Sequence, residues 1–205
     1  MFSLPALAHP HSWVDMKTEI LGQNDTITGF KMQWTFDRMT TAYLLDGEDM
    51  TPHHRVKTLK AITQSVIKNM LPSHNFTYLE EGKGKKKHLL HYQAITDGHF
   101  DVVKGKAIFN FTLPLLHPYQ FNQNKPLSLR IFDPTYYVDM SWTSKDDVQF
   151  SPTLKPYCSA TMIEPHPTPA QVNKAMAIPI DASPNYELGK VFTQAVTFSC
   201  HYENK

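Results

Sequence analysis

The pattern that most restricts the fold of this chain is a strict alternation of apolar and polar residues between positions 30 and 36. The alternating residues are Phe30, Lys31, Met32, Gln33, Trp34, Thr35 and Phe36. A period of two places successive side chains on opposite faces of a strand, so this stretch predicts a β-strand with one buried face. Residues 13–21 are compatible with a second strand, and the turn residues at 23–25 predict that the two form a hairpin.

One long helix is expected, over residues 52–71. Its apolar side chains recur every three or four residues, which is the spacing of one buried helical face. These side chains are Val56, Leu59, Ile62, Val66, Ile67 and Met70. Thr51 is the expected N-cap, Pro52 takes the first helical position, and Pro72 ends the helix.

The remaining chain mostly predicts short strands. They are expected at residues 94–103, 106–113, 127–131, 136–142, 158–163 and 196–202, with short helices near 38–45 and at 169–177. This succession predicts an α+β fold of mostly antiparallel sheet. The long helix is inserted after an amino-terminal hairpin, and a disulfide-linked strand lies near the carboxyl end.

The first eight residues predict the end of a secretory signal. Pro5 precedes small residues at Ala6 and Ala8, which is the pattern of a cleavage site after Ala8. We therefore expect a signal remnant at residues 1–8, whose true start lies upstream, and a single periplasmic metal-binding domain at residues 9–205. In an oxidising compartment Cys158 and Cys200 are expected to form a disulfide.

Composition and motifs argue against several other classes of protein. The formal net charge is +1, which gives no electrostatic case for binding nucleic acid or an anionic membrane. No apolar run is long enough to span a bilayer. The sequence has no nucleophile elbow, HExxH motif or phosphate-binding loop, so neither an enzyme nor a small organic substrate is predicted.

Two histidines follow the expected cleavage site. Cleavage would make His9 the first residue, with both an α-amine and an imidazole, and His11 would lie on the same side of an extended chain about 7 Å away. These nitrogens can converge on one transition-metal ion. Asp15 lies about 13 Å beyond His11, too far to join them directly, so it is assigned a supporting role around the site. The alternative is a disordered tail with incidental histidines.

Four motifs, taken together, resemble a known family. They are His9-Pro10-His11 with Val14-Asp15, then Trp34-Thr35-Phe36-Asp37, then Asp133-Pro134-Thr135-Tyr136-Tyr137, and finally Cys158 and Cys200. The set resembles exported bacterial proteins described as periplasmic components of ABC-type transport systems, including the periplasmic partner of ZevAB-type zinc uptake systems. The resemblance implies a protein that works beside an inner-membrane metal permease, with zinc as the cargo and nickel or cobalt as alternatives.

Zinc prefers four nitrogen, sulfur or oxygen ligands, so His9 and His11 need further ligands. Asp37 and Asp133 are candidates because both follow apolar strands and lie in the matched motifs. Each has an ordinary alternative, Asp37 as the cap of the following helix and Asp133 as part of a turn. Three aromatic residues are expected to support the site by packing or hydrogen bonding: Trp13, Tyr136 and Tyr137. For Trp13, the alternative is packing in the core.

The sequence departs from the family in one place. Some relatives carry an EF-hand-like loop before the long helix, but residues 46–49 lack its alternating oxygen ligands, so calcium is not predicted.

The sequence leaves two other functions open. A leading histidine with a second histidine is also how histidine-brace copper monooxygenases bind copper. Pro10 has no amide hydrogen and therefore excludes the copper motif built on deprotonated backbone amides. The third interpretation is a scaffold that binds a membrane protein, with incidental histidines.

Overall fold

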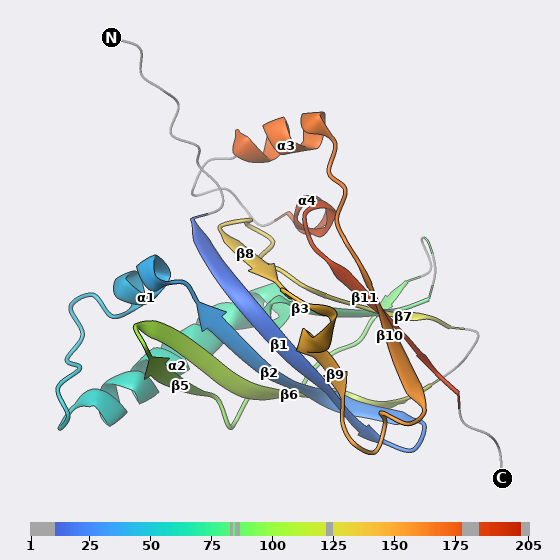
Figure 1. The fold of residues 1–205 in the computed structure, drawn as a ribbon, viewed down its shortest axis with the longest axis horizontal. Coiled ribbons are helices and arrows are strands. Elements are labelled where there is room, and N and C mark those ends of the chain that lie inside the picture. The colour runs from blue at the N-terminus through green and yellow to red at the C-terminus, as the bar shows by residue number, and fades with distance from the viewer. Residues whose placement is uncertain (1–10, 83, 85–86, 122–124, 178–184, 202–205) are drawn as a thin grey trace.

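The computed structural model describes residues 11–82, 84, 87–121, 125–177 and 185–201. Two β-sheets form the body of the molecule, with helices around them (Figure 1). The six-stranded sheet contains, in spatial order, β5 (His99–Val103), β6 (Lys106–Gln120), β2 (Thr26–Phe36), β1 (Ser12–Gln23) and β8 (Val138–Ser141), and β9 (Val148–Phe150) also pairs with β1. The five-stranded sheet contains β10 (Cys158–Ile163), β11 (Ala195–Cys200), β7 (Leu127–Ile131), β3 (Thr77–Glu81) and β4 (His88–Leu89).

The helices are few. They are α1 (Arg38–Leu44), α2 (Arg55–Met70), α3 (Pro169–Met176) and α4 (Tyr186–Val191), with 3-10 segments at Leu71–Phe76 and Lys145–Asp147. In the part of the chain described, no helix is both long enough and apolar enough to cross a membrane. The expected α+β fold is confirmed, because most strand pairs are antiparallel and the one long helix follows the first hairpin.

The predicted amino-terminal hairpin is present. β1 and β2 run antiparallel, with Met16 opposite Trp34 and Ile20 opposite Phe30. Asn24 takes a left-handed conformation in the turn, with φ of 53°, which asparagine adopts more readily than most residues. The alternating side chains of β2 face inward, and the Trp34 ring packs edge-on against Phe111 at 4.9 Å.

The two sheets share one hydrophobic core. Leu79 and Leu129 of the five-stranded sheet are fully buried in the same cluster as the inward-facing residues of β1, β2 and β6. Polar bonds reinforce this contact. The Gln194 side chain accepts the Trp142 N–H at 2.8 Å and donates to the Trp142 carbonyl at 3.0 Å, and the Trp142 indole donates to Thr18 Oγ1 at 3.1 Å.

The long helix begins at Arg55, so the predicted start at residue 52 was wrong. Thr51 does not cap it, because the Thr51 hydroxyl and N–H both donate to Asp49 Oδ1, at 2.7 and 3.0 Å. The chain therefore makes a turn before α2. His54 occupies the N-cap position without a side-chain capping bond.

Other boundaries and pairings also differ from expectation. β5 begins at residue 99 instead of 94, and α4 was not predicted. β8 and β9 run parallel to β1, with Ser12 beside Val138 and Thr18 beside Val148. A period-two pattern identifies a strand but not its partner, so distant parallel neighbours leave no local signal. The expected last strand continued to Tyr202, which lies outside the described residues.

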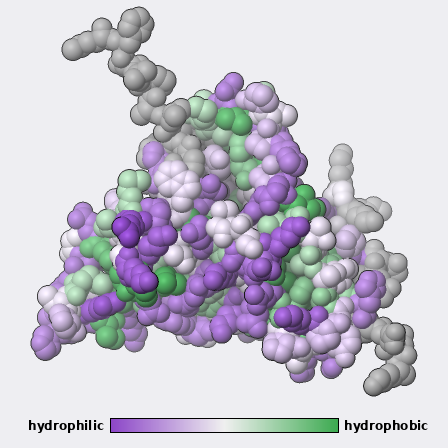
Figure 2. Space-filling view, viewed as in Figure 1, coloured by the Kyte–Doolittle hydropathy of each residue, from purple (hydrophilic) through white to green (hydrophobic). Residues whose placement is uncertain are grey.

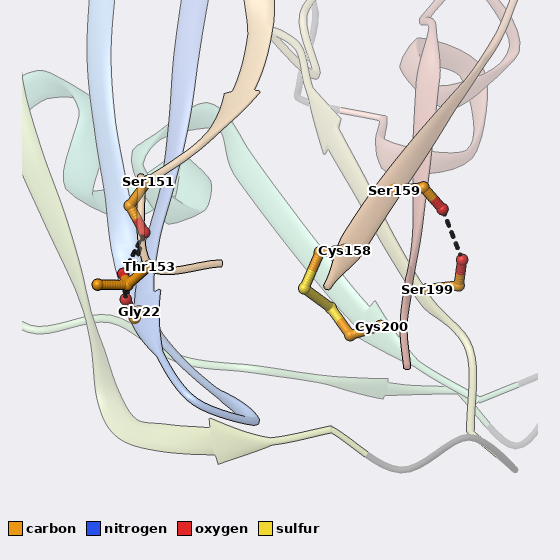
Figure 3. The surroundings of a disulfide bond; sticks show 7 residues. All are labelled: Gly22, Ser151, Thr153, Cys158, Ser159, Ser199 and Cys200. Atoms are coloured by element: carbon orange, nitrogen blue, oxygen red, sulfur yellow. Dashed lines mark hydrogen bonds between the residues drawn. A yellow bond between two sulfur atoms is a disulfide. The ribbon is translucent and has the colours of Figure 1, made fainter. Parts of the chain in front are cut away.

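The predicted disulfide joins Cys158 and Cys200 (Figure 3). The two residues lie opposite each other in the antiparallel pair of β10 and β11. Next to them, the hydroxyls of Ser159 and Ser199 are 2.9 Å apart across the same two strands. Disulfides persist in oxidising compartments, so this bond agrees with a location outside the cytoplasm.

Replacing both cysteines, as Cys158→Ala with Cys200→Ala, should lower the free energy of unfolding by up to about 4 kcal/mol, because the bond closes a loop with a sequence separation of 42. Urea unfolding followed by circular dichroism measures the loss. The matched control replaces the neighbouring hydroxyl pair, as Ser159→Ala with Ser199→Ala, and should cost less than about 1 kcal/mol. Equal urea midpoints for the wild type and the cysteine variant would contradict the prediction.

Candidate functional site

His11 lies at the amino-terminal end of β1, where the described chain begins. Its backbone N–H donates to the Tyr137 carbonyl at 2.9 Å. Its ring stacks on the Tyr137 ring, with centroids 5.0 Å apart and planes inclined by 30°. The backbone bond extends the parallel pairing of β1 with β8, which begins at Ser12 and Val138. The strand register thus fixes the backbone of His11, and stacking places the Tyr137 ring beside its imidazole.

A pocket of about 230 Å³ lies at this end of β1. The residues that line it are His11, Ser12, Met39, Thr40, Tyr43 and Tyr137. Its volume is below the roughly 300–1,000 Å³ of sites for drug-sized ligands, so it is too small for a large organic molecule. Met39 and Tyr43 are 64% and 80% exposed, which places them at the pocket rim.

Asp37 caps α1, as the alternative prediction for this residue proposed. Its Oδ1 accepts the N–H groups of Met39 at 2.7 Å and Thr40 at 2.9 Å. Its Oδ2 accepts the Trp13 N–H at 2.9 Å and the Thr40 hydroxyl. The Asp37 N–H in turn donates to the Trp13 carbonyl at 3.0 Å. One carboxylate therefore ties the start of α1 to the start of β1.

These bonds also stabilise the charged form of Asp37. Burial alone would raise the pKa of this carboxyl, but the hydrogen bonds from Thr40, Trp13 and Met39 outweigh it and lower the pKa below 3.8. A carboxylate offers about four lone-pair positions, and each oxygen of Asp37 already accepts two bonds. A metal ion could bind here only by displacing one of these donors.

Asp133 is buried and organises the turn before β8. Its Oδ1 accepts the Thr135 N–H at 2.9 Å. Its Oδ2 accepts the Thr135 hydroxyl at 2.6 Å and the N–H groups of Tyr137 and Val138, both at 3.2 Å. The predicted turn role is confirmed. This carboxylate holds the backbone of Tyr137, whose carbonyl and ring both contact His11.

The other predicted residues lie around the end of β1 in different ways. Trp13 is 46% exposed, so the alternative that it packs in the core was wrong. Asp15 is exposed and lies beside Thr35 in the sheet. Tyr136 packs against Phe192 at 4.6 Å, and its φ of 60° marks the tight turn. None of the three lines the pocket.

Three of the four predicted ligands, His11, Asp37 and Asp133, lie in the described residues, and these three do not form a metal-binding cluster there. His9 lies outside the described residues. In the described ranges, no group of three or more His, Cys, Asp or Glu side chains is placed to hold a metal ion. Asp37 and Asp133 instead stand on either side of the segment from His11 to Trp13, one fixing α1 and the other fixing Tyr137. Their role as metal ligands remains a prediction.

The sequence did not identify Ser12, Met39, Thr40 and Tyr43 as pocket residues. A signal for them exists in retrospect. Asp37 ends β2 and caps α1, and β2 is the hairpin partner of β1. The first helix after the hairpin must therefore begin beside the start of β1, and its residues become neighbours of His11.

Comparison with known proteins gives two matches. A family model described as "Protein of unknown function (DUF1007)" matches residues 1–200. The chain is also 31% identical over 202 residues to a protein of Haemophilus influenzae (strain ATCC 51907 / DSM 11121 / KW20 / Rd) described as "Uncharacterized protein". That alignment covers 97% of this chain and 94% of the relative. Both matches span the two sheets and the pocket.

Asp37→Ala should lower the free energy of unfolding by about 2 kcal/mol, because it removes both the α1 cap and the acceptor for the Trp13 N–H. Asp37→Asn is the matched control. It can keep the cap through its carbonyl oxygen and lose only the second acceptor, so about half of that cost is expected. Urea unfolding at pH 7 measures both.

The Asp37 effect should also depend on pH. Because the pKa of Asp37 is lower in the folded state, its stabilisation is present above the ordinary value of 3.8 and is lost as the pH falls through the folded pKa. The difference in the free energy of unfolding between wild type and Asp37→Ala should therefore become smaller in acid. No difference at pH 7, or a difference that stays the same at low pH, would contradict the assigned role.

Proposed function

We propose a function for this chain, which belongs to the DUF1007 family. The protein binds a transition-metal ion in the periplasm, with zinc the first choice, and passes the ion to an inner-membrane metal permease. The proposed ligands are His11, together with the imidazole and terminal amine of His9 in the processed protein. The observation that carries the proposal is the placement of the His11 ring at a small pocket.

The position of His11 supports a metal-binding role. Imidazole nitrogen is a good ligand for zinc, nickel, cobalt and copper alike. The His11 ring is set by its backbone bond to Tyr137 and by stacking on the Tyr137 ring, so it is oriented before any ion arrives. Such preorganisation reduces the entropy cost of binding. The volume of the pocket also suits a hydrated ion.

In this proposal Asp37 and Asp133 position the site, because their oxygens already accept backbone and hydroxyl hydrogens. The remaining positions around the ion would be filled by water or by a side chain of the receiving protein. A site with exchangeable ligands suits transfer, since one ligand at a time can be replaced. Delivery to a permease rests on the family resemblance of the sequence motifs.

Zinc titration calorimetry tests the proposal with protein that begins at His9. His11→Ala should weaken zinc binding at least ten-fold, which is about 1.4 kcal/mol, since it removes one imidazole ligand. His99→Ala, at an exposed histidine in β5, is the matched control and should leave the affinity unchanged. Equal affinity of wild type and His11→Ala would overturn the proposal, and binding weaker than micromolar would favour the scaffold interpretation.

Two further arms separate the remaining alternatives. Protein that retains residues 1–8 should bind zinc more weakly, because the nitrogen of residue 9 is then an amide. Copper-loaded protein beginning at His9 is assayed for oxygen consumption with a reductant. Turnover there would identify a histidine-brace enzyme in place of a transfer protein.

A further inference from the structure

β10 is the strand at one edge of the five-stranded sheet, where within the described residues it pairs only with β11. Edge strands can add further strands unless something blocks them. The six residues of β10 include no charged residue, proline or glycine. In Figure 1 this strand, in orange, crosses β11 in the right-hand part of the view, and the chain leads from it up to α3.

The other sheet edges are blocked. β4 has only two residues, and β8 and β9 have four and three. β5 carries charged Asp101, and the Arg55 guanidinium donates to the Val102 carbonyl at 3.1 Å. Short strands, charges and side chains on the edge are the usual protections against unwanted pairing. Among the residues that the structure describes, β10 has none of these protections.

The direction of the backbone groups in β10 follows from its register with β11. Cys158 lies opposite Cys200 with a Cα–Cα distance of 4.1 Å, close to the roughly 4.5 Å of a non-hydrogen-bonded pair. Pair types alternate along an antiparallel ladder. Ala160 and Met162 therefore direct their N–H and C=O groups away from β11. In agreement, the Thr161 carbonyl accepts the Thr197 hydroxyl of β11 at 3.4 Å, and the Tyr157 carbonyl, next to Cys158, accepts the His201 N–H at 2.9 Å.

We propose that β10 pairs antiparallel with β10 of a second copy of this chain, about a two-fold axis at Thr161. Two five-stranded sheets would then form one continuous sheet. Ala160 of each copy would exchange backbone bonds with Met162 of the other, and the two Thr161 side chains would face each other. Threonine pairs are favourable across strands. This inference is independent of the metal-binding proposal.

The sequence around β10 favours a second copy as the partner. Antiparallel pairing about Thr161 places Lys155 at the same end of the strand pair as the partner's Glu164, three residues or roughly 10 Å apart along the strands, so each end combines opposite charges. The Glu164 carboxylate also accepts the Gln194 side-chain amide at 3.1 Å. Pro156 and Pro165 lie five residues before and four residues after the centre, and limit the pairing at both ends.

The surface around β10 also suits a contact between two copies. Exposed apolar residues lie at the strand and on α3 after it: Tyr157, Ile163, Val172 and Met176. Figure 2 shows green and pale residues mixed with purple, hydrophilic ones over the right-hand part of the molecule, where Figure 1 places β10. One added strand per copy forms a smaller contact than a standard interface of about 1,600 Å², so the dimer should be weak and concentration-dependent.

Sedimentation equilibrium of the whole chain over a range of concentrations tests this. The wild type should dimerise with a Kd of about 1 mM or tighter. Thr161→Lys should weaken dimerisation about ten-fold or more, because two like charges would face each other at the axis. Ser199→Lys, which adds the same charge on the next strand inward, is the matched control and should leave the Kd unchanged.

Proline substitutions test the direction of the backbone groups separately. Ala160→Pro removes an outward N–H, so it should abolish the dimer and leave the melting temperature of the monomer nearly unchanged. Thr161→Pro removes a bond to β11 and should lower that temperature clearly. A wild type that stays monomeric at about 1 mM, or a dimer that persists unchanged in both Thr161→Lys and Ala160→Pro, would overturn the proposal.

Discussion

The rest of the structure depends on β1, which pairs with its hairpin partner on one side and with strands from far along the chain on the other. On one side β2 pairs antiparallel through a short turn. On the other side β8 and β9 pair parallel, although Val138 stands far along the chain from Ser12. Closing so long a loop costs entropy before any contact forms, but the cost grows only slowly with loop length. Backbone bonds along both edges of β1, and the core beneath it, offset this cost.

Two carboxylates complete this arrangement at the amino-terminal end of β1. Each follows an apolar strand and accepts the backbone N–H groups that the next turn or helix leaves without partners. Asp37 does so for α1 and also holds Trp13, whereas Asp133 does so for the turn that presents Tyr137. The segment from His11 to Trp13 is thereby fixed from both sides. The stacking of the His11 ring on the Tyr137 ring joins the two sides.

The parts of the fold that sequence could predict are those with a local signal. The first hairpin follows from alternation and a turn, and the disulfide from two cysteines in a chain that is expected to be exported. The parallel partners of β1 have no such signal, because strand patterns do not name their neighbours. The start of α2 was misplaced because Asp49, two residues before Thr51, competes for the capping hydroxyl.

The sequence also could not distinguish two roles of an aspartate that follows a strand. From the sequence alone, Asp37 and Asp133 fit either metal ligation or backbone capping, since both use carboxylate oxygens. The number of lone pairs already engaged distinguishes them, and that number depends on donors such as Trp13 and Val138, which come from other elements. An ion would have to displace a hydrogen bond whose loss leaves a polar group without a partner, at about 1–3 kcal/mol. The carboxylates of Asp37 and Asp133 therefore hold the backbone, and His11 lines the pocket beside them.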